Sequence, residues 1–308
     1  MTDHWPVALV QFQVSPDPEI NHQQARHWLE LAMAPVPEQR SPRLLMLPEI
    51  WNSPYQAERF AEFAEPIPAL GSELVDGPSA SLAMVAEFAK SHVVSVIAGS
   101  IPECTPDGRI FNTATVISPG GRLLAKHRKM HLFDVDIPGG IHFHESESLT
   151  AGDQVTVLSG FDDPLETGLP KPPNLGLQIC YDIRFPELSL LMQQQMNCTV
   201  VACPAGFSTT TGPLHWHLVM RARAVDTQCF VLACCGARPP QGSSDYPSYG
   251  HSMVVDPWGH IVAEAGIGEE LVRADLDLDQ IASARAAIPT SRQRRPDVYR
   301  LESSTPNA

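Results

Sequence analysis

Short runs of valine, isoleucine and leucine recur along this chain and alternate with segments whose apolar residues follow helical spacing. The apolar runs lie at 7–14, 43–51, 93–103, 175–180, 198–205 and 229–236. Helices are expected at 21–34, after Gly77-Pro78, from Pro186 onward and at 212–228. Continuous apolar runs are typical of strands buried on both faces, and their alternation with helices predicts an α/β protein.

Two further segments have the pattern of hairpins, and one has the pattern of a long loop. Turn residues at 119–121 and 256–259 predict hairpins over 111–133 and 251–265. The stretch 134–152 has few periodic apolar residues, and loops of this length are more often functional than idle. The expected sheet structure is therefore mixed, with one long functional loop.

Neither an internal repeat nor a low-complexity linker divides the sequence. Its 308 residues are enough to bury a large core. We therefore expect a single domain over residues 1–300, followed by a frayed tail over 301–308. The proline-rich stretches 164–173 and 239–247 are expected to be surface loops.

The net charge, the N-terminal segment and the cysteines indicate which partners and which cellular location to expect. A formal net charge of −14 argues against nucleic acid or a membrane as a partner, because both would repel the protein. The N-terminal MTDHWPVALVQF has no signal-peptide pattern, and no apolar segment approaches the roughly 20 residues needed to cross a bilayer. Seven cysteines, an odd number, are typical of reduced thiols. The sequence therefore predicts a cytoplasmic protein, with a mitochondrial pool as the alternative.

Cys180 stands where the apolar run LGLQIC gives way to the polar YDIR before a helix. A side chain at such a turn is presented at the carboxyl end of a sheet, where α/β proteins bind their ligands. Free cysteines are also among the most frequently buried residues, and they often act as small apolar side chains. Position alone leaves a catalytic and a structural role equally open for this thiol.

Histidine and cysteine side chains are also potential metal ligands. The chain has no CxxC pair, and HFH (142–144) and HWH (215–217) place histidines two residues apart. In a loop the first pair has the geometry to bind a metal, whereas on a helix the second pair would diverge. Neither has a third ligand at a recognisable spacing, so the sequence predicts no metal site.

Three motifs together resemble those of the nitrilase-like carbon–nitrogen hydrolases. They are LMLPEIWNSPY around Glu49, RKMHLFDVDIPG around Lys129 and GLQICYDIRFPEL around Cys180. Taken singly, Glu49 and Lys129 have the character of ordinary surface charges. Their order and the near end-to-end span of the similarity make the resemblance specific. It implies a four-layer αββα sandwich, a homodimer, and catalysis without an organic cofactor or metal.

The resemblance also assigns roles to residues. Cys180 would attack an amide, with Glu49 as general base and then general acid. Lys129 would lower the pKa of the thiol and, with the backbone N–H of Tyr181, hold the oxyanion. Glu145 would position Lys129 and the substrate or water.

For the substrate, a cation is needed to meet a remote carboxylate. Arg184 is the expected partner, since a guanidinium binds a carboxylate in bidentate fashion; the alternative is an ion pair with Asp182 or Glu187. The resemblance places Phe207 and Thr211 in the same pocket, together with Tyr55.

Within the family, HLFDVDIPGGIHFHESESLTAGD is similar to the omega-amidases, which hydrolyse the terminal amide of 2-oxo acids such as 2-oxoglutaramate and 2-oxosuccinamate. RFPELSL and RARAVDTQC are as similar to amidases that cleave deaminated glutathione, which are one alternative. A second alternative is an inactive relative that serves as a binding or scaffold protein. Two positions depart from the omega-amidase pattern: Gly140 replaces a frequent lysine, and His217 replaces the glutamate of HWE.

Overall fold

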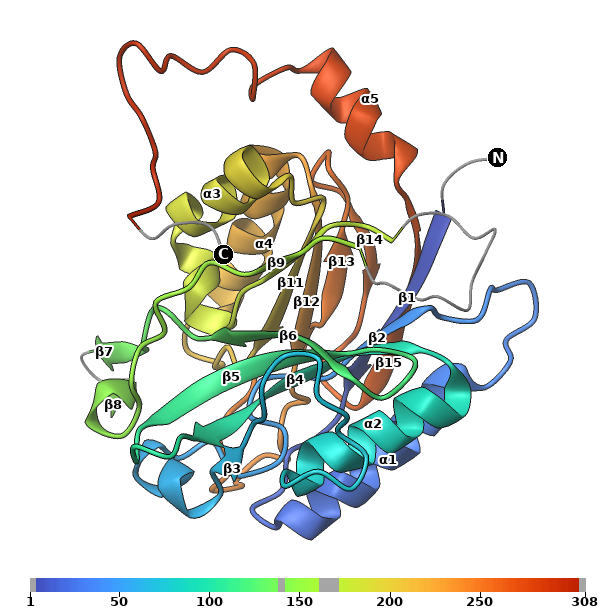
Figure 1. The fold of residues 1–308 in the computed structure, drawn as a ribbon, viewed down its shortest axis with the longest axis vertical. Coiled ribbons are helices and arrows are strands. Elements are labelled where there is room, and N and C mark those ends of the chain that lie inside the picture. Colours follow the sequence, from blue (N-terminus) through green and yellow to red (C-terminus); the bar gives the residue numbers. More distant parts are fainter. Residues whose placement is uncertain (1–3, 138–141, 161–171, 305–308) are drawn as a thin grey trace.

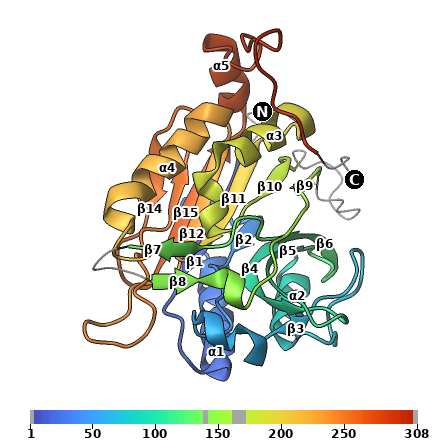
Figure 2. The ribbon, with the colours of Figure 1, turned by 90° about the vertical axis from the view of Figure 1, so that its left-hand side faces the viewer.

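The computed structural model describes residues 4–137, 142–160 and 172–304, and most of their strands lie in two sheets stacked face to face (Figures 1 and 2). The first sheet has the order β15–β1–β2–β4–β5–β6, with β3 added beside β4. The second has the order β14–β13–β12–β11–β10–β9. A separate two-stranded ribbon consists of β7 and β8.

The bounds of the strands of the first sheet are β1 (His4–Gln11), β2 (Leu44–Met46), β3 (Glu65–Pro66), β4 (Ser95–Cys104), β5 (Ile110–Ile117), β6 (Leu123–Arg128) and β15 (Glu270–Asp277). Those of the second are β9 (Val157–Leu158), β10 (Leu175–Leu177), β11 (Val200–Ala205), β12 (Phe230–Cys235), β13 (Met253–Val255) and β14 (Ile261–Glu264). The ribbon is β7 (Asp134–Asp136) and β8 (His142–His144). Both large sheets are mixed, because parallel central pairs are joined to antiparallel outer ones.

Within the described ranges, five α-helices accompany the strands: α1 (Pro18–Met33), α2 (Ala80–His92), α3 (Pro186–Met196), α4 (Gly212–Thr227) and α5 (Asp279–Ala287). Local chemistry sets their ends. The side chain of Asp17 caps α1 by accepting the Glu19 N–H, and Ser79 caps α2 by accepting the Leu82 N–H. Pro186 stands in the first turn of α3, where its missing N–H costs nothing.

Alternation along β1 shows how four layers arise. Ala8 and Val10 pack in the core shared with α1 and α2, on the outer side of the first sheet. Val7 and Leu9 point the other way, into the core between the two sheets. On the far side, α3 and α4 cover the second sheet through a third core (Figure 1). The arrangement is helix, sheet, sheet, helix, and the α/β, four-layer prediction is confirmed.

Most predicted elements are confirmed, with shorter strands than expected. The apolar run 43–51 is a strand only over Leu44–Met46, and the run 175–180 only over Leu175–Leu177. In both segments the backbone leaves the sheet before the apolar run ends, and the last residues of the run lie in a turn. These turns hold Glu49 and Cys180, so the shortening places both side chains beyond the sheet edges.

The prediction of a structureless stretch over 134–152 is wrong in part. It contains a short 3₁₀ helix, Glu145–Glu147, and the β7–β8 ribbon, in which Asp134–Asp136 pair with His142–His144. Residues 164–171 of the proline-rich stretch 164–173 and residues 305–308 of the tail 301–308 lie outside the described residues. Among the described helices, none has the length and apolar character needed to span a bilayer.

Candidate active site

Glu49 is held in a tight turn after β2. Ile50 has a positive φ of 46°, and its N–H donates to the Ser100 hydroxyl at 3.1 Å. The turn lies directly over Gly99, where a Cβ atom would overlap the Pro48 carbonyl oxygen. Glycine at 99 therefore allows the turn to approach β4, and Glu49 projects into the interior with 3% of its surface exposed.

Lys129 follows the last residue of β6. Along β6 the side chains alternate between buried and partly exposed positions, and Lys129 stands one residue beyond Arg128 on the buried side. Its backbone is fixed from both directions, since its N–H donates to Asn112 and its carbonyl oxygen accepts from Gly152, each at 2.8 Å. The ammonium group is consequently placed in the interior on a rigid base.

Three charged side chains that lie far apart in the sequence meet there, and we call Glu49, Lys129 and Glu145 the Lys129 cluster. Lys129 Nζ lies 3.0 Å from Glu49 Oε1 and 2.8 Å from Glu145 Oε1. All three side chains are fully buried. Glu145 is anchored further by the Phe133 N–H, which donates to its Oε2 at 2.8 Å. One buried cation thus lies between two buried carboxylates.

The two oxygens of Glu49 have different surroundings. Oε1 accepts from Asn112 Nδ2 at 2.9 Å as well as from Lys129. The Tyr55 hydroxyl lies 3.2 Å from that oxygen and 2.9 Å from Glu145 Oε1, so its single proton serves both carboxylates. Oε2 is buried and has no N–H or O–H donor among the described residues. This oxygen is free to receive a proton.

Cys180 begins the short 3₁₀ helix Cys180–Arg184 after β10, with a positive φ of 45°. A non-glycine residue in this region is strained by roughly 1–3 kcal/mol, and such strain is concentrated at functional sites. Its sulfur accepts the Gly206 N–H at 3.4 Å, and a Cβ at Gly206 would come within 3.0 Å of Glu49 Oε2. Gly206 therefore lies against both the thiol and the carboxylate.

The pKa shifts describe how protons are distributed in the cluster. Burial raises the pKa of Glu49, and this outweighs the opposing effects of Lys129 and of a hydrogen bond with the Cys180 thiol. Burial would lower the pKa of Lys129, but Glu145 and Glu49 raise it well above its ordinary value. The ammonium is therefore retained, and Glu49 is the group poised to exchange protons.

The expected lowering of the Cys180 pKa is wrong for the site without substrate. Burial, followed by the charge of Glu49, raises the pKa of the thiol well above its ordinary value, and Lys129 only partly offsets this. Cys180 is thus a neutral thiol that must lose its proton during attack.

Asp182 joins the two sheets beneath the site. Its Oδ1 accepts from the His131 backbone N–H at 2.9 Å and lies 2.7 Å from His131 Nδ1. Its Oδ2 accepts from the Ile179 N–H at 3.0 Å and lies 3.2 Å from His127 Nε2. Burial would raise the Asp182 pKa, but the bonds with both histidines hold it far below its ordinary value. One carboxylate therefore fixes the segments on either side of Lys129 to the turn that carries Cys180.

The backbone of that turn offers a free donor. The N–H of Tyr181 makes no hydrogen bond to any acceptor in the described part of the chain, whereas the N–H of Asp182 is taken by the Ile179 carbonyl oxygen at 3.0 Å. The free N–H belongs to the residue directly after Cys180. It is available to an oxygen atom that forms next to the sulfur.

Arg184 does not form the ion pair that was the alternative to substrate binding. Asp182 is occupied as described above, and none of the ion pairs within the described ranges includes Arg184 or Glu187. Its Nη1 lies 3.0 Å from His215 Nδ1, and its guanidinium lies over the Phe207 ring at 4.6 Å from the centroid. Burial lowers its pKa from the ordinary arginine value. The guanidinium is oriented by a ring and a histidine, and no protein carboxylate neutralises it.

The other predicted pocket residues differ in how closely they approach the cluster. Tyr55 contacts both carboxylates directly. Phe207 is buried against Trp216 and reaches the site through Arg184. Thr211 stands at the N-cap position of α4, without a capping bond from its side chain, and its carbonyl oxygen accepts the His215 N–H. It therefore supports the Arg184 side of the site from a distance.

The loop 239–250 reaches the pocket, a point on which the sequence carried no signal. Tyr246 stacks near Tyr55, with ring centroids 4.5 Å apart, and its hydroxyl donates to the Gly206 carbonyl oxygen at 2.8 Å. The pocket beside Glu49 is lined by Tyr55, Gly206 and Tyr246 among others. Asn112 and Asp182 were also not predicted as site residues from the sequence, although both lie next to predicted site residues in space.

The two departures from the expected motif have different outcomes. His217 Nε2 lies 2.7 Å from Oε1 of Glu264, the last residue of β14. The substitution at 217 therefore does not alter the contacts of the Lys129 cluster. Gly140 lies outside the described residues.

Comparison with known proteins gives a consistent result. The model of the carbon–nitrogen hydrolase family matches residues 6–286. The omega-amidase NIT3 of Saccharomyces cerevisiae is 44% identical over 295 residues, covering 95% of this chain and 94% of the relative. The human omega-amidase NIT2 is 40% identical over 97% of this chain and 98% of its own. The crystal structure of S. cerevisiae Nit3, a member of the nitrilase superfamily, superposes with a TM-score of 0.80 over 95% of this chain and 97% of its own, at 41% identity.

Proposed function

This chain belongs to the carbon–nitrogen hydrolase family, and from that membership we propose that it is an omega-amidase that converts 2-oxo dicarboxylate monoamides to the 2-oxo acid and ammonia. It is a hydrolase that acts on carbon–nitrogen bonds, and its substrate is a small amide. Within this class, 2-oxoglutaramate and 2-oxosuccinamate are the proposed substrates. The observation that carries the proposal is the buried Lys129 cluster beside the Cys180 turn.

The first half of the reaction forms a thioester. The Cys180 sulfur bonds to the amide carbon while Glu49 takes the thiol proton, and the carbonyl oxygen becomes an oxyanion. The Lys129 ammonium and the Tyr181 N–H stabilise this oxygen, and such positioned donors are worth about 3–4 kcal/mol each. Glu49 then gives its proton to the nitrogen, the carbon–nitrogen bond breaks, and ammonia leaves.

The second half returns the enzyme to its starting state. Water attacks the thioester carbon as Glu49 takes one of its protons, and the carbon–sulfur bond breaks as that proton returns to sulfur. The raised pKa of Glu49 suits a carboxyl that is protonated and deprotonated in turn. Glu145 acts as a positioning residue, because its contacts with Lys129 and Phe133 hold the ammonium in place.

Arg184 is proposed to bind the substrate carboxylate remote from the amide. Its guanidinium lacks a carboxylate partner within the described ranges and is already oriented by Phe207 and His215. A planar guanidinium binds a carboxylate through two parallel hydrogen bonds. The charged end of a 2-oxo acid amide would thus lie at Arg184 and its amide at Cys180.

The test is ammonia release by the purified protein from 2-oxoglutaramate and, separately, from deaminated glutathione. We expect faster turnover of the first, abolished in Cys180→Ala and kept in Cys203→Ala. Cys203 is a matched control because it is another buried thiol, 4.0 Å from the Cys180 carbonyl oxygen. Preference for deaminated glutathione would assign the same chemistry to the longer substrate. No turnover of either substrate by the folded protein would favour a binding protein.

A cytoplasmic homodimer remains part of the proposal. On α4, Leu214, Leu218 and Val225 are 71%, 67% and 51% exposed, which is unusual for a surface that faces only water. A second copy packed on α4 would cover them. Sedimentation of the wild type and Leu218→Glu tests this, since a charge in the interface is expected to shift a dimer to monomers.

A further inference from the structure

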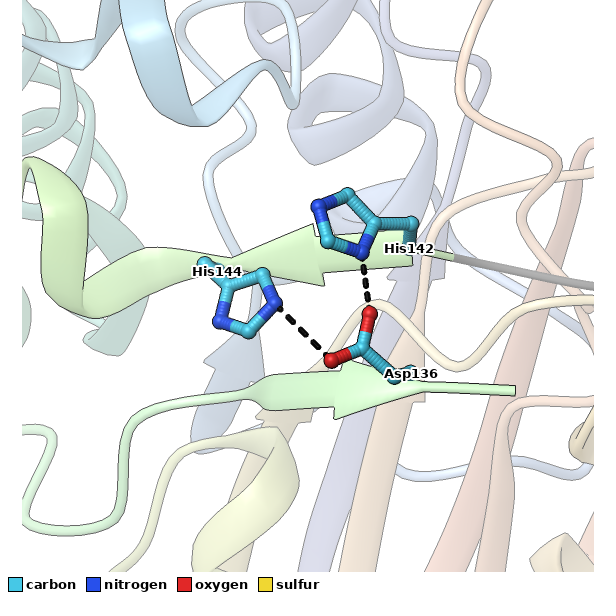
Figure 3. Close-up of side chains that lie close together, drawn as sticks. All are labelled: Asp136, His142 and His144. Carbon is cyan, nitrogen blue, oxygen red and sulfur yellow. Dashed lines mark hydrogen bonds and ion pairs between the residues drawn. The ribbon is translucent and has the colours of Figure 1, made fainter. Parts of the chain in front are cut away.

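The β7–β8 ribbon brings two histidines and a carboxylate together on one face, as Figure 3 shows. Asp136 lies opposite His142 in the antiparallel register. His142 Nδ1 contacts Asp136 Oδ1, and His144 Nε2 lies 3.4 Å from Asp136 Oδ2. One potential ligand atom from each residue lies within 4.8 Å of the others. The three groups therefore converge on one point in space.

The geometry of the ribbon explains this convergence. His142 and His144 are two residues apart on a strand, so their side chains leave the same face, and their ring centroids are 4.6 Å apart. Asp136 comes from the facing strand and supplies the third group. The sequence pattern HFH did not reveal this carboxylate because it lies six residues earlier, across the ribbon.

The opposite face of the ribbon packs against two residues that line the pocket, Tyr55 and Tyr246. Phe143, between the two histidines, points inward, and its ring centroid is 5.6 Å from that of Tyr55 and 6.4 Å from that of Tyr246. The residue after His144 is Glu145 of the Lys129 cluster. The ribbon thus has an inner face that serves the pocket and an outer face whose polar groups the proposed reaction does not use.

We propose that Asp136, His142 and His144 bind a divalent transition-metal ion of the Zn²⁺ type on the outer face of the β7–β8 ribbon. Two imidazole nitrogens and one carboxylate oxygen are a donor set that Zn²⁺ accepts, with water in the remaining position. The side chains of His142 and Asp136 are 76% and 67% exposed, so an ion and its water can reach them. The ion would tie the two strands together and take no part in bond breaking. This inference does not depend on the proposed function.

The described residues contain one other cluster with the same kinds of groups, and it serves as a control. His217 Nε2 and His251 Nδ1 lie 2.7 and 3.0 Å from a single oxygen, Oε1 of Glu264. In the ribbon, by contrast, each histidine contacts a different oxygen of Asp136. The side chains of the second cluster are also less exposed, at 38%, 25% and 28%. We therefore assign the ion to the ribbon and not to this second cluster.

The experiment is a titration of full-length, tag-free, chelator-treated protein with Zn²⁺, followed by calorimetry, and with Co²⁺, followed by its visible spectrum. We expect one Zn²⁺ per chain and a Co²⁺ spectrum without a thiolate charge-transfer band. Loss of a group that only hydrogen-bonds to a metal ligand already weakens metal binding about 10–100-fold. Loss of two ligands in His142→Ala/His144→Ala should therefore weaken binding about 100-fold or more. Asp136→Asn, which preserves shape, should also weaken binding, whereas His217→Ala should leave it unchanged.

Several outcomes would overturn the assignment. Unchanged affinity in both ribbon variants would show that the ion binds elsewhere, and loss of binding in His217→Ala would place it at Glu264. A thiolate band that disappears in Cys180→Ala would place it at the nucleophile. Equal binding of Mg²⁺ would indicate a carboxylate site without histidine ligands.

Discussion

Two groups of charged residues at β6 and its end differ in their ratio of cations to carboxylates. In the Lys129 cluster one cation lies between two carboxylates. In the second group, which we call the Glu103 cluster, Glu103 Oε1 lies 3.2 Å from Lys126 Nζ and 2.8 Å from Arg128 Nη2. Burial alone would raise the pKa of Glu103, but bonds from Arg128 and Thr113 and the charge of Lys126 lower it below its ordinary value. Glu103 thus stays ionised, whereas Glu49 is placed to change its charge.

The difference teaches that neither residue type nor burial alone distinguishes a structural carboxylate from a reactive one. Glu103 and Glu49 are 1% and 3% exposed, so both are buried. What separates them is the ratio of cations to carboxylates and the exposure of the cations, since Lys126 and Arg128 keep about a quarter of their surface in water. A carboxylate that has more than one cation beside it stays ionised, whereas a carboxylate that shares a single cation with another one can take up and release a proton.

The strongest way to break this comparison is to remove the charge of each carboxylate in turn. Glu49→Gln is expected to lower kcat/KM for 2-oxoglutaramate about 10²–10⁴-fold, because the general base is lost. Glu103→Gln should change kcat/KM only a few-fold, since Glu103 contacts no group of the Lys129 cluster. Steady-state ammonia release measures both. Comparable losses in the two variants would mean that Glu49 contributes only structure.

The cations give the next largest contrast, measured as the free energy of unfolding in urea. Lys129→Met leaves two buried carboxylates without their cation and should destabilise the fold by about 3–5 kcal/mol. Lys126→Met breaks a partly exposed pair and should cost about 0–1 kcal/mol. Adding Glu49→Gln to Lys129→Met should recover part of the loss. If this double variant were less stable than Lys129→Met, charge imbalance would not be the cause.

The dependence of activity on pH sharpens the comparison further. The acidic limb of kcat/KM follows ionisation of the essential base in the free enzyme. Because the pKa of Glu49 is raised, this limb should lie above the ordinary glutamate value of about 4.3. Glu103→Gln should leave the limb in place. A limb at or below the ordinary value would show that Glu49 is not the titrating group.

The smallest expected effect is on stability as a function of pH, where the two carboxylates should act with opposite sign. The pKa of Glu103 is lowered on folding, so its contribution is full above the unfolded-state pKa of about 4.3 and is lost as pH falls through the folded value. The pKa of Glu49 is raised, so its contribution is present below the unfolded value and is lost as pH rises through the folded one.

Urea unfolding from pH 3 to 8 checks these signs. Glu103→Gln should be less stable than wild type at neutral pH, and this difference in the free energy of unfolding should shrink as the pH falls. Glu49→Gln should gain stability relative to wild type as the pH rises towards neutral. Parallel curves for the two variants would contradict the opposite pKa shifts.

The sequence predicted those parts of the molecule that depend on neighbours along the chain. Apolar runs located the central strands, Pro186 marked a helix start, and the motifs around Glu49, Lys129 and Cys180 named residues that lie together. The strand β15, with charges at Glu270, Arg273 and Asp275, was not predicted, because it is an outer strand whose pattern is interrupted by polar residues.

The parts that the sequence did not predict depend on contacts between distant segments. Tyr246 reaches Gly206 only because its loop folds across the pocket, and Asp136 meets His142 only across the ribbon. The pKa of Cys180 was predicted in the wrong direction because Lys129 was counted without the burial of the thiol and the charge of Glu49, which together outweigh it. Such balances are set by the folded neighbourhood and leave no local pattern.

Asp182 has a consequence for how this enzyme can diversify. Its two oxygens join the lysine-bearing segment of one sheet to the Cys180 turn of the other, through contacts that involve neither the loop 239–250 nor the start of α4. Changes in those outer segments can then alter which amide is accepted while the bond-breaking apparatus is inherited intact. A designer seeking a new substrate would accordingly vary the loop and preserve the aspartate.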